Sequence, residues 1–220
     1  MTLVIAIDGP SGSGKSTVAR TVAAQLGLPV LDTGAMYRAV TLAVIEADAD
    51  LTDPEACARI AGATEITVEE GVTMLDGRDV SAEIRGPVVT GAVSTVSAHP
   101  AVREILVARQ RAWVERHRGG VVEGRDIGTV VFPAATVKVF LDASDDERAR
   151  RRHRDEVAAA RPVAVDDVKA ALDRRDAIDS GRAVSPLRAA DDAILIDTTN
   201  LDIETVAADI VARARSAEAR

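Results

Sequence analysis

The sequence predicts an α/β fold in which a parallel sheet is covered by helices on both faces. Short apolar runs rich in Val, Ile and Leu recur along the chain, and segments with helical periodicity separate them. Such runs are typical of strands that are buried on both faces, and their alternation with helices is typical of a parallel sheet. We expect the 220 residues to form a single domain, 1–220, that contains insertions.

The first predicted strand, Leu3–Ile7, leads into a glycine-rich loop and then a helix marked by Val18, Val22 and Leu26. In this context the pattern G-x-x-x-x-G-K-[ST] predicts a phosphate-binding loop, or P-loop, for ATP and Mg²⁺. Backbone N–H groups in such a loop bind phosphate oxygens. We expect Lys15 to add a positive charge at the β- and γ-phosphates and Ser16 to bind the metal. The loop residues are Gly9, Pro10, Ser11, Gly12, Ser13, Gly14, Lys15, Ser16 and Thr17.

The next elements follow the same alternation. Gly27 ends the first helix, and Pro29–Asp32 is predicted as a second strand. Thr33 is expected to cap a helix that continues through Ile45. A further helix is predicted to open at the capping box Thr52-Asp53-Pro54-Glu55.

A small antiparallel unit then interrupts the α/β pattern. Glu65–Glu69 alternates polar and apolar residues, Glu70-Gly71 is expected to turn the chain, and Val72–Leu75 is expected to run back. Helices are predicted at Val88–Val96 and Ala101–Val114.

Three more strands complete a predicted five-stranded parallel sheet: Val121–Glu123, Val137–Asp142 and Ala193–Asp197. A second capping box, Ser144 to Glu147, is predicted to begin a strongly basic helix. The segment Arg161–Arg188 carries many charges, and we expect it to be mobile and exposed to solvent. An amphipathic helix is predicted after Asp202.

Composition excludes several classes of protein. The net charge of -8 argues against a nucleic-acid partner. Cys57 is the only cysteine, which excludes a disulfide within the chain and suits a reducing compartment. The first apolar run is too short for a signal peptide, and no 18 consecutive residues are apolar. We therefore expect a cytoplasmic monomer with no membrane partner.

The arginines indicate which reaction to expect. Binding one nucleotide requires little beyond the P-loop, whereas moving phosphate between two anionic substrates requires more positive charge where they meet. The candidates are Arg38, Arg125, the Arg148–Arg154 cluster, and Arg175 with Arg182. Phosphoryl transfer of this kind does not need a histidine base, so we assign none to His99, His117 or His153.

The chain resembles the bacterial-type cytidylate kinases from the P-loop to the last strand. The order and spacing of three motifs besides the P-loop are specific to that family. Glu123 stands where the family more often has Asp, and Thr33 where it more often has Ser. The motifs are Leu31-Asp32-Thr33-Gly34-Ala35-Met36-Tyr37-Arg38, the run from Glu123-Gly124-Arg125-Asp126 to Pro133, and the run from Arg175-Asp176 to Leu187.

The resemblance implies a P-loop kinase that transfers the γ-phosphoryl group of ATP to CMP or dCMP. It implies that residues 63–100 form a CMP-binding insertion and that 148–185 form a mobile lid over ATP. Catalytic roles are implied for Lys15, Arg125 and Arg182. The implied acceptor-site residues are Thr33, Arg38 and Arg125 at the phosphate, Ser94, Arg103 and Asp126 at cytosine, Arg175 and Asp179 at the sugar, and Arg182 at the monophosphate.

A P-loop also occurs in proteins of three other functions. A P-loop kinase for a sugar acid or shikimate would not need so many residues that match a nucleotide acceptor. A GTPase switch would need an N-K-x-D loop, and the only asparagine, Asn200, is followed by Leu201-Asp202. A module that only binds ATP would release no ADP in response to an acceptor.

Overall fold

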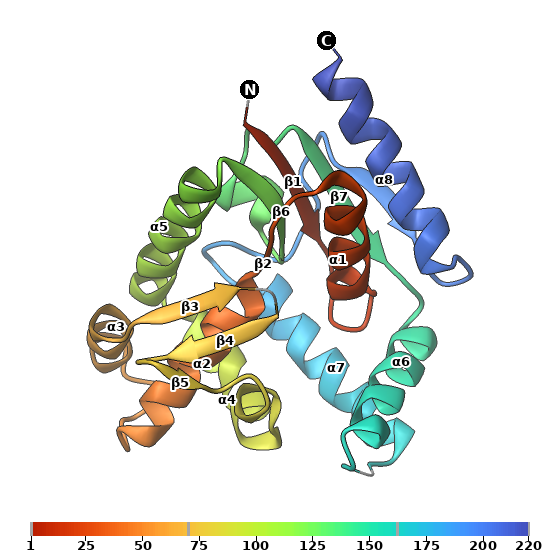
Figure 1. The fold of residues 1–220 in the computed structure, drawn as a ribbon. Coiled ribbons are helices and arrows are strands. Elements are labelled where there is room, and N and C mark those ends of the chain that lie inside the picture. The colour runs from red at the N-terminus through yellow and green to blue at the C-terminus, as the bar shows by residue number, and fades with distance from the viewer. Residues whose placement is uncertain (1, 70, 162, 220) are drawn as a thin grey trace.

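A five-stranded parallel sheet forms the centre of the molecule (Figure 1). The computed structural model describes residues 2–69, 71–161 and 163–219. The strand order is β2-β6-β1-β7-β8, which confirms the predicted sheet. The strands are β1 (Leu3–Asp8), β2 (Val30–Asp32), β6 (Gly119–Gly124), β7 (Val137–Asp142) and β8 (Ile194–Asp197).

The central strand β1 is buried along its whole length, as its apolar sequence predicts. It pairs with β6 on one side and β7 on the other, so that Asp8 lies beside Gly124 and Phe140. In the outer pair, Asp32 of β2 lies beside Glu123 of β6. The register therefore brings Asp8, Asp32 and Glu123 to the carboxyl edge of the sheet, where open α/β sheets bind their ligands.

Helices cover both faces of the sheet (Figure 1). On one face α1 and α8 contribute the apolar positions that the sequence marked, among them Val22 and Ile210. On the other face α2, α4 and α5 pack around Val40 and Leu106. The helices named here and α3 are α1 (Lys15–Leu26), α2 (Thr33–Glu46), α3 (Pro54–Ala63), α4 (Pro87–Ala98), α5 (Pro100–His117) and α8 (Ile203–Glu218).

Two helix caps differ from the prediction by one residue. Asp32, and not Thr33, caps α2 by accepting a hydrogen bond from the Ala35 N–H group. Asp53, and not Thr52, caps α3 by accepting from Glu55 and Ala56. In both places a carboxylate and a hydroxyl stand next to each other, and the sequence alone does not tell which one reaches the free N–H groups.

The antiparallel unit has three strands where two were predicted: β3 (Ile66–Glu69), β4 (Val72–Leu75) and the short β5 (Arg78–Asp79). A two-residue strand has too little alternation to be recognised from sequence. Glu70 of the predicted turn lies outside the described residues. Val68, Leu75 and Val80 join the core against α2, and a 3-10 turn (Glu83–Arg85) leads to α4.

The segment Arg161–Arg188 was predicted to be mobile and solvent-facing, and it contains a helix, α7 (Val165–Ser180). Its Val168 and Leu172 are buried against Ala149 of the basic helix α6 (Asp145–Ala158). Two apolar positions among many charges gave too weak a periodicity to predict this helix. A π-helical turn, η2 (Ile127–Val131), was also not predicted. Within the described ranges, no helix combines the length and apolar character needed to cross a membrane.

Candidate active site

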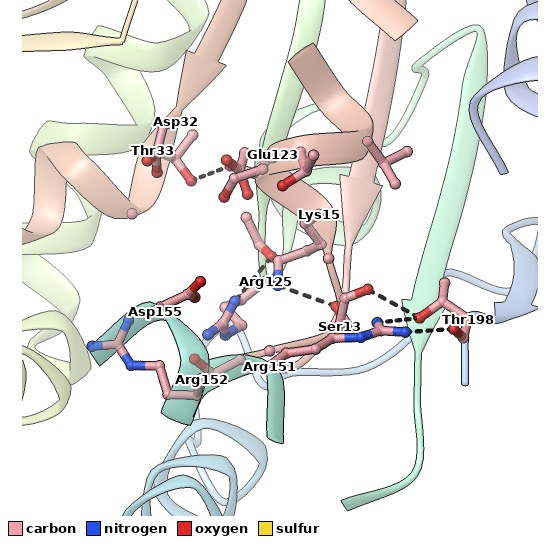
Figure 2. A pocket seen from close by; sticks show the side chains of 18 of the residues that line it. Ser13, Lys15, Asp32, Thr33, Glu123, Arg125, Arg151, Arg152, Asp155 and Thr198 are labelled. Atoms are coloured by element: carbon pink, nitrogen blue, oxygen red, sulfur yellow. Dashed lines mark hydrogen bonds between the residues drawn. The ribbon is translucent and has the colours of Figure 1, made fainter. Parts of the chain in front are cut away.

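A cavity of about 990 Å³ opens at the carboxyl edge of the sheet (Figure 2). Its walls come from the P-loop, the start of α2, the segment after β6, helices α4 to α7 and the loop between β8 and α8. The predicted residues Gly9, Pro10 and Ser94 do not line it. The predicted residues that do are Ser11, Gly12, Ser13, Gly14, Lys15, Ser16, Thr17, Thr33, Arg38, Arg103, Arg125, Asp126, Arg175, Asp179 and Arg182.

Two glycines of the P-loop are required by close packing. Gly9 has φ +148, and a Cβ atom there would lie 2.0 Å from the Leu141 carbonyl oxygen of β7. Gly12 has φ +82, and a Cβ atom there would lie 2.8 Å from the Arg148 carbonyl oxygen of α6. A side chain at either position would push the loop away from its neighbours, so the loop holds its shape only with glycine there.

The ammonium group of Lys15 is buried within its own loop. It donates to the Pro10 carbonyl oxygen at 2.6 Å and lies 3.5 Å from the Ser13 hydroxyl. Burial lowers the pKa of Lys15, and the guanidinium of Arg125 lowers it further. A bound polyphosphate would place a negative counter-charge beside this buried ammonium group.

A buried carboxylate, Glu123, lies near Lys15 and Ser16 (Figure 2). Burial raises the pKa of Glu123, the neighbouring Asp32 carboxylate adds to the increase, and Lys15 opposes it. The Thr33 hydroxyl donates to the Glu123 carbonyl oxygen at 2.7 Å and so ties α2 to the end of β6. The site therefore holds acidic oxygen atoms beside the predicted metal ligand Ser16.

An ion pair between Arg103 and Asp126 forms one wall of the cavity. Their closest atoms are 2.5 Å apart, and both side chains are about 95 % buried, with 4 % and 5 % exposed. The Arg103 guanidinium lies over the ring of Tyr37, 5.1 Å from its centre, and also donates to the Ser97 carbonyl oxygen. Burial raises the pKa of Tyr37 to about 12. This wall therefore holds a hydrogen-bond acceptor, the Asp126 carboxylate, next to a hydrogen-bond donor, the Arg103 guanidinium.

Three arginines of the site gather around one buried carboxylate, Asp179 of α7. Arg125 and Arg182 contact it at 3.1 and 2.5 Å, and Arg175 lies 3.9 Å away. Burial lowers the pKa of Arg175 to about 10, with Arg125 as the next cause. A single carboxylate does not balance three guanidinium groups, so the cluster retains an excess of positive charge.

Arg38 comes from α2 and contacts the 3-10 turn Glu83–Arg85 and the start of α4. It donates to the Ile84 carbonyl oxygen at 2.9 Å and to the Thr90 hydroxyl at 2.8 Å. Burial lowers the pKa of Arg38 to about 9, and the nearby Arg175 and Arg152 lower it further. The three arginines repel one another in the absence of an anion, which is the electrostatic condition of a site that binds phosphate.

The basic helix α6 packs directly on the P-loop. Arg148 is buried, donates to the Ser11 carbonyl oxygen at 3.1 Å and pairs with Asp176 of α7. Arg151 donates to the Thr198 hydroxyl and carbonyl oxygen, and the same hydroxyl donates to Ser13 (Figure 2). The P-loop is thus joined to α6 and to the end of β8.

Sequence analysis missed several residues of this site. Both serines are buried, but Ser97 lines the cavity and accepts a hydrogen bond from Arg182 at 2.8 Å, whereas the predicted Ser94, one helical turn earlier, does not line it. The two serines are three residues apart on α4, so the sequence could not tell which one faces the cavity. Asp8 follows the predicted strand Leu3–Ile7 and Asp32 ends the predicted strand Pro29–Asp32, and these positions were the available sign of a role.

Comparison with known proteins identifies the fold and the relatives of the chain. A family model described as cytidylate kinase matches residues 5–216. A cytidylate kinase of Nocardia farcinica is 52 % identical over 208 residues, covering 93 % of this chain and 90 % of that protein. One of Geobacillus thermodenitrificans is 49 % identical and covers 95 % of each chain. A shikimate kinase structure from Acinetobacter baumannii shares the fold, with a TM-score of 0.50, 17 % identity and coverage of 100 % of this chain and 97 % of that chain.

Proposed function

Because this chain belongs to the cytidylate kinase family, we propose that it transfers the γ-phosphoryl group of ATP to CMP or dCMP, giving ADP and CDP or dCDP. The observation that carries the proposal is the cluster of Arg125, Arg175 and Arg182 on Asp179, in the cavity that Lys15 also lines. A protein that only binds ATP would not need this second group of buried cations.

The reaction is a direct transfer. A phosphate oxygen of the acceptor attacks the γ-phosphorus, and the bond from that phosphorus to the bridging oxygen of ADP breaks. Lys15, Arg125 and Arg182 neutralise the charge that the transferring group carries between its two partners. Such positioning and charge neutralisation account for most of the catalysis in phosphoryl transfer.

The acceptor nucleotide is assigned to the wall formed by α2, α4, α5 and the segment after β6. Arg38 and Arg125 bind its phosphate, with Thr33 nearby, and Arg175 and Asp179 meet its sugar. Asp126 accepts from the 4-amino group of cytosine, while Arg103 donates to the ring. Ser94 stays a proposed cytosine-site residue. Ser97 lines the cavity and accepts from Arg182, so we assign Ser97 to the support of Arg182.

The donor phosphates are assigned to the P-loop, together with Mg²⁺. The fit of the metal rests on the oxygen donors present: the Ser16 hydroxyl with Glu123 and Asp32 beside it. Among the described residues there is no group of three His, Cys, Asp or Glu side chains that could hold a metal by themselves. That is the arrangement expected for Mg²⁺ that keeps waters and binds substrate phosphates. When bound beside Ser16, Mg²⁺ would supply positive charge that neutralises part of the charge of the donor phosphates.

Two segments are proposed to move during the reaction. Residues 63–100 carry the acceptor-side insertion, and residues 148–185, which include α6 and α7, form the lid over ATP. Closing the lid excludes water, which would otherwise accept the phosphoryl group. The cytoplasmic location and the monomeric state stay predictions.

Product analysis tests this function. With ATP, Mg²⁺ and CMP, the protein should form CDP and ADP in equal amounts, and ADP should not accumulate without an acceptor. Lys15→Ala protein prepared in parallel is the control for a contaminating kinase. ADP release that does not respond to CMP would refute the assignment, and so would faster turnover with shikimate or a sugar acid.

A further inference from the structure

Asp8, the last residue of β1, is a buried carboxylate that the proposed reaction does not use. It is 4 % exposed and does not line the cavity. One carboxylate oxygen accepts from the Ile127 N–H group at 2.8 Å, and the other accepts from the Gly128 N–H group at 2.7 Å. Both bonds cross from the strand before the P-loop to the segment after β6.

The segment that Asp8 holds contains two residues of the acceptor site. Arg125 and Asp126 directly precede the π-helical turn η2. At the start of this turn the Asp126 carbonyl oxygen accepts hydrogen bonds from the N–H groups of Val130 and Val131. Arg125 in turn donates to the Gly9 carbonyl oxygen at 3.0 Å. Asp8 and Gly9 are adjacent in the chain, and together they hold the segment from Arg125 to Gly128 at both of its ends. Gly9 accepts from Arg125, and Asp8 accepts from Ile127 and Gly128.

Packing around Gly128 is close. A Cβ atom on Gly128 would lie 3.3 Å from the Lys138 side chain and 3.4 Å from an Asp8 carboxylate oxygen. Lys138 is itself fixed by hydrogen bonds to the Pro133 carbonyl oxygen and to Asp192. The turn therefore has little room to shift while Asp8 accepts both hydrogen bonds.

Burying a carboxylate costs free energy, so an apolar side chain would suit the position of Asp8 better if its only role were to fill space. Burial raises the pKa of Asp8 to about 6, although the two N–H groups favour its charged form. The ionised side chain offers an acceptor to each N–H group, whereas an isosteric Asn offers only one. The pair of N–H groups at the start of η2 is therefore the feature that requires an aspartate at position 8.

We propose that Asp8 is a positioning residue for acceptor selection: it holds the turn after Asp126 so that the base-facing carboxylate and Arg125 keep their place relative to the P-loop. This inference rests on the proposed function and adds a residue that does not contact the nucleotide. Losing one of the two bonds should let the turn rotate and weaken the contact of Asp126 with cytosine.

Asp8→Asn tests the proposal, with Asp142→Asn as the matched control because Asp142 ends the neighbouring strand β7 with its side chain exposed. We expect Asp8→Asn to lower kcat/KM for CMP about tenfold, the effect of one charge-assisted hydrogen bond, and to leave the KM for ATP within about twofold. The ratio of kcat/KM for CMP to that for UMP should fall at least about threefold. The control should match the unchanged protein in all three quantities.

Gly128→Ala provides a second test that keeps the carboxylate. Its methyl group should press on the same turn and shift the CMP-to-UMP ratio in the same direction, measured in protein whose melting curve stays cooperative. A CMP-to-UMP ratio of kcat/KM that stays unchanged in both variants would overturn the role of Asp8, even if both nucleotides lose activity equally. Absence of CMP phosphorylation in the unchanged protein would instead refute the proposed function.

Discussion

At the scale of single residues, the site depends on charges that are buried before any substrate arrives. Lys15 is satisfied by the carbonyl oxygen of Pro10, and its lowered pKa shows that the loop alone does not compensate its charge. The same holds for Arg38 and Arg175, whose pKa values burial also lowers. Phosphate groups bound here would supply the missing negative charge. Substrate binding would therefore compensate the buried positive charges of the site.

Replacing Lys15 tests this account of the P-loop. Lys15→Ala should reduce kcat at least about 100-fold, because the variant loses the buried cation that is proposed to neutralise the transferring group. The fold should remain, since removing a poorly compensated buried charge does not disrupt the apolar core. Steady-state kinetics and circular dichroism check the two statements. Near-normal turnover in folded Lys15→Ala protein would contradict the P-loop assignment.

The raised pKa of Asp8 predicts how stability depends on pH. Its folded value is about 6 against an ordinary value of 3.8, so between these two pH values the folded state holds a proton that the unfolded state has lost. The free energy of unfolding therefore contains a contribution from Asp8 that grows as pH falls through 6, up to about 3 kcal/mol near pH 4.

Denaturant unfolding of the unchanged protein and of Asp8→Asn at pH 7.5 and pH 5 measures this contribution. Other carboxyl groups cancel in the difference between the two proteins. The unchanged protein should gain stability relative to Asp8→Asn on acidification. A difference that stays constant, or that changes in the opposite direction, would show that the folded-state pKa of Asp8 is not raised.

At the scale of elements, α6 and α7 differ from the central strands in what holds them. Among the described residues, their shared apolar cluster contains Ala149, Val168 and Leu172, with Val163 packed beside it. Ion pairs such as Arg148 with Asp176 supply much of the remaining contact. An element with so few buried apolar contacts should open more readily than the core of the sheet.

Hydrogen exchange tests the mobility of this region. Without nucleotides, amides of α7 should exchange much faster than those of β1, and exchange in α7 should slow when a non-hydrolysable ATP analogue and CMP are added together. The β1 amides serve as the internal reference. Exchange in α7 as slow as in β1 without ligands would exclude the lid.

The elements also show where prediction from sequence succeeds. The five strands of the sheet were predicted because each contains a short apolar run, and in β1 and β6 burial on both faces leaves that pattern in the sequence. Helix α7 was missed because only two of its buried side chains, Val168 and Leu172, are apolar. The turn η2 was missed because Asp8, a residue more than a hundred positions away, stabilises it.

At the scale of the whole molecule, the site is assembled from segments far apart in the chain. Asp179 of α7 meets Arg125 after β6, and Arg182 meets Ser97 of α4, which joins the proposed lid to the acceptor-side insertion. The types of residue in these segments could be predicted from the motifs. Their partners could not, because the pairing of Ser97 or Asp8 depends on tertiary contacts that leave no local pattern.

The assembled site is proposed to select cytosine. In the proposed site Asp126 would accept from the 4-amino group of cytosine, whereas uracil presents a carbonyl oxygen there, so the contact would change from attraction to repulsion. Water that enters an open site can bridge part of the mismatch, which keeps the discrimination below the roughly 10⁴-fold that a fully matched site reaches.

The most direct measurement is kcat/KM for CMP, dCMP, UMP, AMP and GMP in one coupled assay at saturating ATP and Mg²⁺. CMP and dCMP should both be good acceptors, and UMP should be worse by at least about 100-fold. Asp126→Ala should reduce that ratio mainly by lowering the value for CMP. Equal kcat/KM for CMP and UMP in the unchanged protein would contradict the cytosine site.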